Sequence, residues 1–367
     1  MADAGLTKKE SALIQAARHQ EEEDRSLREE RKTARTLLEV NQPVVFRLLD
    51  QTIRTQDVSH AYLFTGKRGS LKREMAVLLA QSVILGSDDG LIREEERSEE
   101  DQADCRRIAE GTYGDLLIFD GYQKQSIDKK DVDMIQSVFA KTSMEKHNRK
   151  VYIIDRCENM TIGAMNSLLK FLEEPAENVY AILIADNPER LLPTIISRCI
   201  PIRFYPIPEE VYRELALQEG TDAEDAFFLS RILAQTSGYT RRAASVSYQR
   251  AKLMFKQWAG IEGNRDLFLV DYDVRYRIKP KDLRSDENVK DSNLDLLEMF
   301  FGMVIGYCED ILKDAHDGPS WYHNAVKKHI RRDYQRILEI AVEERDRCNR
   351  VNDLSLLLNQ AVYRMEV

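Results

Sequence analysis

Short apolar runs alternate with stretches of helical periodicity from about residue 42 to residue 205. Four of these runs are almost continuously apolar, which is typical of strands buried on both faces of a parallel sheet. They are residues 61–64, 115–120, 151–155 and 180–185. Between the first two runs, residues 73–85 place apolar side chains at helical spacing. Strands alternating with helices in this way predict an α/β nucleotide-fold domain.

Beyond residue 206 the pattern changes to helices alone, so the predicted fold class is α/β followed by all-α. We predict a small helical domain over residues 206–252 and a C-terminal helical domain over residues 253–367. The beginning of the C-terminal domain, residues 253–283, is the least regular part. Within it, residues 266–278 could form a strand pair or an inserted loop.

Residues 1–41 form a polar N-terminal extension rich in Glu, Arg and Gln, with only a weak helical stripe. We interpret the extension as a solvated or frayed helix, with a partner-binding arm as the alternative. Its first thirty residues lack the apolar core of a secretory signal. No apolar run in the chain reaches the length of about 18 residues that suggests a membrane span. We therefore expect no membrane partner.

Composition adds one feature to this picture. The chain of 367 residues has a net charge of −9, with 43% hydrophobic and 32% charged residues, which excludes a wholly disordered protein. An acidic balance also argues against coating nucleic acid by bulk charge. Residues 87–104 hold nine acids against two arginines and so account for most of the surplus. We expect this acidic insertion to repel itself and stay solvated.

The five cysteines are widely spaced and form no C-x-x-C pair, so we expect free thiols rather than disulfides or a zinc cluster. They are Cys105, Cys157, Cys199, Cys308 and Cys348.

The first candidate for chemistry is a phosphate loop between the strand 61–64 and the helix 73–85. Its candidate phosphate-contacting residues are Gly66, Gly69, Ser70 and Lys72. In a working loop, G-x-x-x-x-G-K-[ST], the second glycine allows close backbone approach and the hydroxyl ligates Mg²⁺. Here Leu71 replaces that glycine and Arg73 replaces the hydroxyl residue. The segment is a degenerate phosphate loop, or else a plain strand–turn–helix junction.

The second candidate is the acidic end of the strand 151–155. Asp155 stands where a metal-ordering Asp belongs, but Arg156 occupies the place of the Glu that activates water. A guanidinium stays protonated and cannot act as a base. Glu158 lies two residues further along and is expected to point elsewhere. The sequence therefore predicts no hydrolysis by this chain alone, doubtful ATP binding and no cofactor or metal.

The third candidate is Ser197-Arg198-Cys199, which follows the last strand of the predicted fold. An Arg at a subunit edge can reach a neighbour's γ-phosphate and stabilise the transition state, as an arginine finger does. Taken alone the tripeptide is a weak signal, and Arg198 could equally form an ordinary surface ion pair.

Three strings resemble the clamp-loader branch of the AAA+ family and stand in its order and spacing. They are His60–Gly66, Asn166–Pro175 and Leu192–Cys199. The resemblance is strong over residues 42–250 and weaker toward the C-terminus. It implies a RecA-like AAA+ domain over residues 42–205, a helical lid domain over residues 206–252 and a helical collar domain for oligomerisation over residues 253–367.

The resemblance also implies an assembly. Clamp loaders are pentamers that open a ring-shaped sliding clamp and place it on primed DNA, using ATP bound between subunits. The implied partners are ATPase subunits of the gamma or tau type, a delta subunit, the sliding clamp and primed DNA. The implied location is the bacterial cytoplasm, at the nucleoid-associated replisome.

A degenerate loop combined with a retained Ser-Arg-Cys arginine is typical of delta-prime subunits in the DNA polymerase III holoenzyme. By position, Arg198 would be the trans-acting finger, flanked by Ser197 and Cys199. Arg241 resembles the lid's sensor arginine, a role that the degenerate loop puts in doubt. Many relatives carry a four-cysteine zinc module where the acidic insertion lies. Only Cys105 remains there, so we predict no zinc.

The leading interpretation is a non-catalytic stator subunit that completes a neighbour's ATPase site. The alternatives are an ATP-hydrolysing subunit similar to gamma or tau, and a role in another DNA-repair or helicase-loading assembly. Direct DNA contact could involve Lys146, Arg149 and Lys150, which could equally form a solvated turn before the strand 151–155.

Overall fold

The computed structural model describes most of the chain from Arg35 onward. The described residues are 35–121, 126–139, 143, 145–233, 235–260, 265–283, 288–315, 317–328, 333–348, 351 and 353–365. Of the predicted N-terminal extension, residues 1–34 therefore lie outside the described residues.

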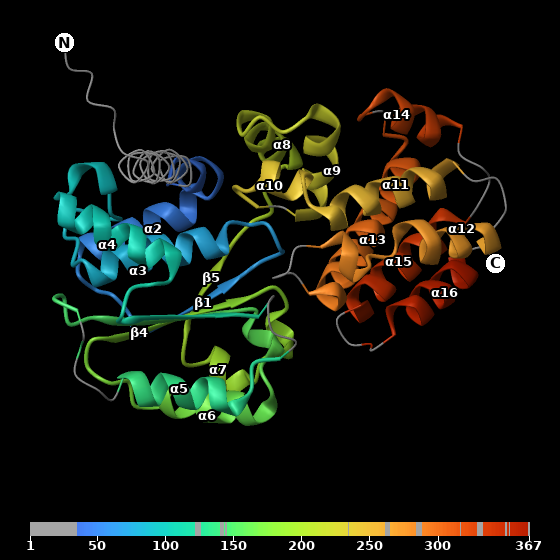
Figure 1. Ribbon diagram of the computed structural model, residues 1–367. Helices are drawn as coiled ribbons and strands as arrows, with labels where there is room; N and C mark the ends of the chain where they lie inside the picture. Colours follow the sequence, from blue (N-terminus) through green and yellow to red (C-terminus); the bar gives the residue numbers. More distant parts are fainter. Residues whose placement is uncertain are drawn as a thin grey trace, which may run out of the picture. The chain divides into compact units, whose positions relative to one another are not determined.

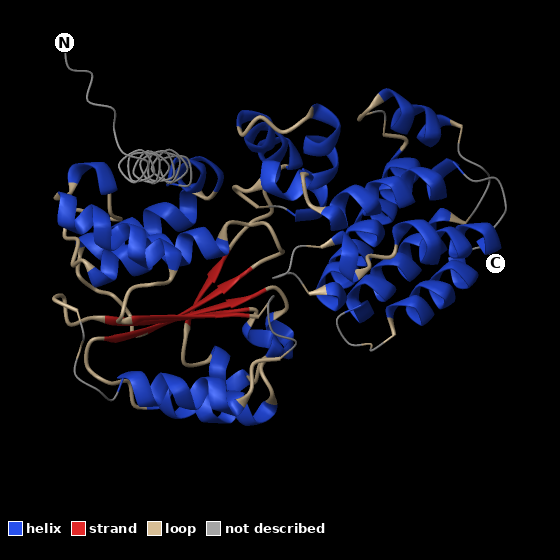
Figure 2. Cartoon of the chain, in the orientation of Figure 1, coloured by secondary structure: helices blue, strands red, loops and turns tan. Residues whose placement is uncertain are grey.

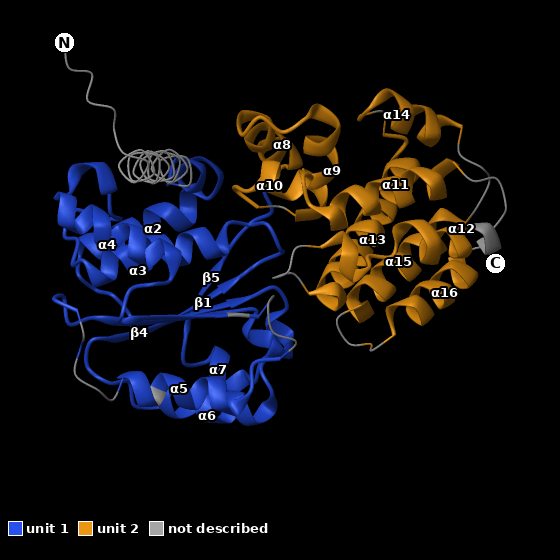
Figure 3. Cartoon of the chain, in the orientation of Figure 1, with its two compact units in different colours: residues 1–207 blue, residues 208–367 orange. Residues whose placement is uncertain are grey.

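Two compact units make up the chain, residues 1–207 and residues 208–367 (Figure 3). The predicted boundary at residue 206 lies next to this division. The further division at residue 253 falls inside the continuous helix α11, Val246–Gly260, and the separate lid and collar domains stay a prediction.

None of the described helices is both long enough and apolar enough to cross a membrane.

The first unit is built on a parallel sheet of five strands in the order β2-β3-β4-β1-β5. The strands are β1 Ala61–Thr65, β2 Leu116–Asp120, β3 Lys150–Asp155, β4 Val179–Ala185 and β5 Ile200–Arg203. The four predicted strands are confirmed to within one residue at either end. β5 was not predicted because it is short and contains Pro201. A proline fits there because β5 is an edge strand that pairs only with β1.

Helices cover both faces of this sheet (Figures 1 and 2). On one face lie α2 Pro43–Arg54, α3 Lys72–Ile84 and α4 Glu99–Glu110. On the other lie α5 Lys129–Phe139, α6 Ile162–Glu173 and α7 Pro193–Ile196. The face toward α5 and α6 buries alternate strand residues, such as Leu63, Ile154 and Leu183. Three short 3₁₀ turns complete the unit, at Glu94–Glu96, Cys157–Asn159 and Pro188–Arg190. The predicted α/β layout is confirmed.

The acidic insertion is more ordered than its charge predicts. Ser98 caps α4 by accepting a hydrogen bond from the Asp101 amide, and the helix starts with three acids. Negative side chains in a first turn are stabilised by the helix dipole, so the dense charge favours this helix instead of opposing it. Leu91 and Ile92 are buried and anchor the segment to the domain. The expectation of a wholly solvated insertion is therefore wrong.

The described elements of the second unit are all helices, as predicted, and the longest of them, α13 Val289–Lys313, packs against α9, α11 and α15. The other helices are α8 Glu209–Gln218, α9 Ala223–Leu233, α10 Tyr239–Ala243, α12 Arg265–Asp271, α14 Ser320–Lys327, α15 Tyr334–Cys348 and α16 Leu354–Met365. Phe255 of α11 lies within 6.3 Å, ring centre to ring centre, of Tyr307, Trp321 and Tyr322. Aromatic contacts of this kind hold the core of the unit together.

The predicted strand pair or loop over residues 266–278 is wrong, because this segment is helical. It comprises α12 and a π-helix, Tyr272–Tyr276, followed by a 3₁₀ turn at Pro280–Asp282. Phe268, Tyr272 and Tyr276 are buried on one side. A spacing of four residues places them on one face of a helix.

Candidate functional site

The degenerate phosphate loop leaves the carboxyl end of β1 at Gly66. This glycine has φ of +152°, and a Cβ there would lie 2.6 Å from the carbonyl oxygen of Phe204, just beyond β5. Only glycine fits so close to a neighbouring backbone in this conformation. The predicted loop position is thus set by the sheet, at the end of a strand that lies between β4 and β5.

Leu71 keeps the backbone shape of the glycine that it replaces. Its φ of 62° and ψ of 26° are left-handed, and it forms the N-cap of α3. Its side chain is buried, with 3% of its surface exposed. A left-handed leucine is strained by about 1–2 kcal/mol, which the packing of its side chain must offset. The loop therefore retains a phosphate-loop backbone but fills it with a leucine side chain.

Lys72, the residue that would neutralise phosphate, is held by its own loop. Its Nζ donates to the carbonyl oxygens of Gly66 at 2.7 Å and Lys67 at 2.8 Å. The same ammonium lies 2.9 Å from Asp186 Oδ1, and its side chain is only 5% exposed. Ser70, also buried, donates to the Lys67 carbonyl. Lys72 is thus neutralised and hydrogen-bonded without any phosphate.

Arg73 occupies the position of the magnesium-binding hydroxyl and points to the metal-ordering carboxylate. Its Nη1 lies 3.4 Å from Oδ2 of the buried Asp155, at the end of β3. A cation next to this carboxylate stands in for the charge that Mg²⁺ would supply in a working site. The residues present do not fit a bound magnesium ion, because an arginine cannot ligate one.

Glu158 does not replace the missing general base. This buried residue accepts hydrogen bonds through Oε1 from the amides of Asp186 at 3.0 Å and Asn187 at 3.3 Å. Glu158 therefore fixes the segment after β4, which carries the Asp186 partner of Lys72. Arg156, left-handed with φ of 51°, separates Glu158 from β3. The expectation that Glu158 points away from the catalytic position agrees with these contacts.

Asp186 was missed by the sequence reasoning. It directly follows β4, the strand paired with β1, and carboxyl ends of adjacent parallel strands meet at one edge of a sheet. The position of Asp186 directly after a strand next to β1 was therefore the signal that could have identified it. The loop, Asp155 and Asp186 are brought together, and together they form two internal ion pairs.

Arg198 lies apart from these pairs, just after the short helix α7. Its Nη1 donates to the Thr194 carbonyl at 2.9 Å, and its Nη2 lies 2.6 Å from Glu173 Oε1. The side chain is 34% exposed. The flanking Ser197 donates to the same carbonyl at 3.1 Å. Cys199 is buried, which raises the pKa of its thiol to about 12 and makes it unreactive at neutral pH. Of the tripeptide, only Arg198 offers charge to a partner.

Arg241 belongs to the second unit, where it is exposed on α10. Its neighbour Arg242 forms an ion pair with Asp295 of α13. The predicted sensing role of Arg241 stays a prediction.

The three cations that could contact DNA all form hydrogen bonds or ion pairs with other residues of the first unit. Lys150 is buried and donates to the Phe139 carbonyl, and Arg149 donates to the Val83 carbonyl. Lys146 lies 2.9 Å from Glu100 Oε1 and also pairs with Asp101 and Asp104. Direct DNA contact by these residues stays a prediction.

Among the residues that the structure describes, one group of side chains has metal-ligand chemistry: Asp101, Asp104 and His147, whose candidate ligand atoms lie within 4.8 Å of one another. The ammonium of Lys146 is 3.2 Å from Asp101 and 3.4 Å from Asp104, and so already balances these carboxylates. Cys105, the one cysteine in the region where many relatives are expected to carry a zinc module, is buried and forms no disulfide. The group is explained as an ion-pair cluster.

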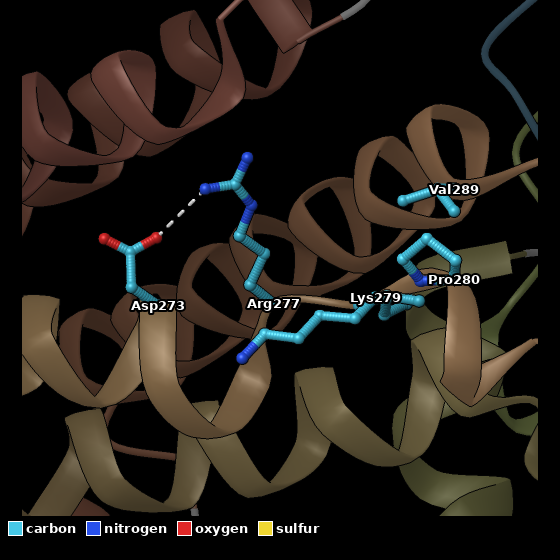
Figure 4. A pocket seen from close by; sticks show the side chains of 6 residues that line it. Asp273, Arg277, Lys279, Pro280 and Val289 are labelled. Atoms are coloured by element: carbon cyan, nitrogen blue, oxygen red, sulfur yellow. Dashed lines mark hydrogen bonds and ion pairs between the residues drawn. The ribbon is translucent and has the colours of Figure 1, made fainter.

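A pocket in the second unit lies beside the π-helix (Figure 4). It is lined by Asp273, Arg277, Ile278, Lys279, Pro280 and Val289. Arg277 and Asp273 pair across it at 3.3 Å, and both are more than half exposed. A solvated ion pair of this kind contributes little energy and no special reactivity. None of the predicted site residues lines this pocket.

Comparison with known proteins shows which proteins the first unit resembles. Residues 41–208 match the profile of a family described as DNA polymerase III, delta subunit. Over this range, the chain is similar to that family. The match supports the resemblance to DNA polymerase III clamp-loader subunits over this range, while the AAA+ assignment of the parallel-sheet domain stays a prediction.

Individual relatives include two kinds of DNA polymerase III subunit. The chain is 37% identical over 208 residues to the delta-prime subunit of Bacillus subtilis, a match covering 56% of this chain and 59% of the relative. It is 34% identical over 167 residues to the tau subunit of the same organism, covering 44% of this chain and 27% of the relative. The chain thus spans less than two thirds of either relative.

A solved structure, the DNA polymerase III gamma subunit-related protein of Thermotoga maritima, is 18% identical with a TM-score of 0.45. That match covers 86% of this chain and 97% of the other.

Proposed function

We propose that this chain is a non-hydrolysing clamp-loader subunit that supplies Arg198 to ATP bound by a neighbouring subunit. It would act as a stator in the cytoplasmic replisome, helping to load the sliding clamp on primed DNA. Its partners would be gamma- or tau-type ATPase subunits and a delta subunit. This proposal extends to the whole chain the similarity that residues 41–208 show to that DNA polymerase III family.

One contrast carries the proposal. Lys72 of the phosphate loop is paired with Asp186 of the same domain, and its side chain is only 5% exposed. Arg198 is also paired, with Glu173, but its side chain is 34% exposed at the surface of the domain. An arginine there can stabilise charge on a phosphate from outside, which is how a finger acts in trans.

Reconstitution tests the proposal. The chain is assembled with an ATP-binding clamp-loader subunit, a delta subunit, sliding clamp and primed DNA, and ATP hydrolysis is measured. Arg198→Ala is expected to leave assembly intact and to lower DNA-stimulated hydrolysis by about 10³-fold or more at the affected site, the usual contribution of a finger. Unchanged hydrolysis by the whole complex would contradict the assignment.

The alternative, an ATP-hydrolysing subunit, gains some support from the tau relative. Binding of radiolabelled ATP to the purified chain separates the two functions, with Lys72→Ala as the control. Tight, magnesium-dependent binding that the control loses would favour the hydrolysing subunit. We expect no such binding, because Lys72 is already held by the loop carbonyls.

A further inference from the structure

We propose that Glu173 is a positioning residue for Arg198, holding the guanidinium in place until a neighbour's phosphate displaces the carboxylate. The inference deepens the proposed function and rests on it. Glu173 is the last residue of α6, and Arg198 follows α7, so the pair joins two separate elements of the first unit.

The geometry of the contact supports a held but releasable arginine. The separation of 2.6 Å between Nη2 and Oε1 is that of a charge-assisted hydrogen bond. A second donor, Nη1, binds the Thr194 carbonyl one helical turn earlier. These two contacts use only two of the five N–H donors of a guanidinium. The remaining donors can approach an anion before the contact with Glu173 breaks.

Because both side chains are partly exposed to solvent, a phosphate can replace the Glu173 carboxylate as the partner of Arg198. The Glu173 side chain is 47% exposed and that of Arg198 is 34% exposed, so water screens the attraction between them. A phosphate is recognised by the same planar array of N–H groups and carries more charge than a carboxylate. Glu173 therefore competes with the phosphate for Arg198 and restrains hydrolysis.

The matched control lies next in the chain. Glu174 is also exposed and is the C-cap of α6, and no ion pair is found for its side chain among the described residues. Glu173→Gln and Glu174→Gln remove the same charge from neighbouring positions. They differ only in the contact with Arg198.

The experiment measures ATP hydrolysis by the reconstituted complex with and without primed DNA. Glu173→Gln is expected to raise the DNA-independent kcat about two- to fivefold, the range of a surface ion pair, at unchanged KM for ATP. Glu174→Gln is expected to match the unsubstituted complex. The double variant Glu173→Gln, Arg198→Ala should hydrolyse ATP at the rate of Arg198→Ala alone, because Glu173 acts only through the arginine.

The outcomes separate this inference from the proposed function. If Arg198→Ala lowers hydrolysis but Glu173→Gln behaves like Glu174→Gln, or lowers the rate, the positioning role is overturned and the finger stands. If Arg198→Ala changes nothing, both fall. Thermal unfolding of the two glutamine variants checks that both are folded.

Discussion

At the scale of single residues, Leu71 shows how a phosphate loop can lose its chemistry and keep its backbone. Leu71→Gly removes both a buried side chain and the left-handed strain, so it is expected to lower the free energy of unfolding by about 2 kcal/mol. Leu71→Ala loses the side chain and keeps the strain, and should be less stable than Leu71→Gly by about 1 kcal/mol. Urea denaturation of the three proteins measures both differences. An alanine variant as stable as the glycine variant would mean that Leu71 is not strained.

An impaired nucleotide site at this loop stays a prediction from the sequence, and the sequence did not predict the contacts that its side chains make. The identities of Leu71, Arg73 and Arg156 were enough to predict an impaired site, because each side chain lacks the required chemistry. The pairing of Lys72 with Asp186 joins positions more than a hundred residues apart. Such a contact depends on strand order, which local spacing does not reveal.

At the scale of elements, the link between α4 and the segment before β3 depends on pH. Glu145 accepts hydrogen bonds from Arg107 at 2.5 Å and from the Gly114 amide at 3.0 Å, and the Arg107 bond is the main cause of its lowered pKa. A carboxylate with a lowered pKa stabilises the fold above its unfolded pKa of about 4.3 and loses this effect as pH falls through the folded pKa.

Glu145→Gln is therefore expected to be less stable than the unsubstituted chain by about 1 kcal/mol at pH 7, a value reduced by the partial exposure of Arg107. At pH 3 the difference should shrink, because this pH lies below the unfolded pKa and the carboxyl of the unfolded chain is then largely protonated. Thermal unfolding at the two pH values measures the effect. An equal difference at both would show that the charge of Glu145 is not its cause.

The strands made of continuously apolar residues were predicted well. The prediction failed where one apolar pattern fits both the period of a helix and that of a strand. Residues 268–278 place an apolar residue at every second position, which is typical of a strand. In the helical part of this segment, residues 268–276, the structure buries every second one of these apolar side chains. Phe268 and Tyr272 are buried, while Val270 is 59% and Val274 is 65% exposed. A period of four is contained in a period of two, so the pattern alone could not distinguish a helix from a strand.

At the scale of the whole molecule, the two units have separate cores and can be destabilised separately. In the second unit, the buried Asp310 of α13 lies 2.5 Å from Arg231 of α9 and accepts a hydrogen bond from Tyr322 of α14 at 2.7 Å. Asp310→Asn is expected to cost about 2–3 kcal/mol, because it leaves a mostly buried arginine with less compensating charge. Its neighbour Glu309 is a matched control, since its pair with Lys313 is exposed and Glu309→Gln should change stability by less than about 0.5 kcal/mol.

Calorimetry of these variants would show whether the units unfold separately. A chain with two independent cores is expected to show two transitions. Asp310→Asn should lower the midpoint of one, and Leu71→Gly the midpoint of the other. If both variants lower a single shared transition, the two units unfold as one.

The closed phosphate loop has a consequence for how the first unit responds to its surroundings. A protein that binds a ligand only when folded gains stability with the logarithm of the ligand concentration. In this unit the carboxylates at the ends of β3 and β4 are neutralised by Arg73 and Lys72, which are part of the chain and cannot dissociate. The loop conformation would then be the same whether a cell holds much ATP or little. In the proposed assembly, such a subunit would give a nucleotide-independent reference, against which ATP-binding neighbours could open and close.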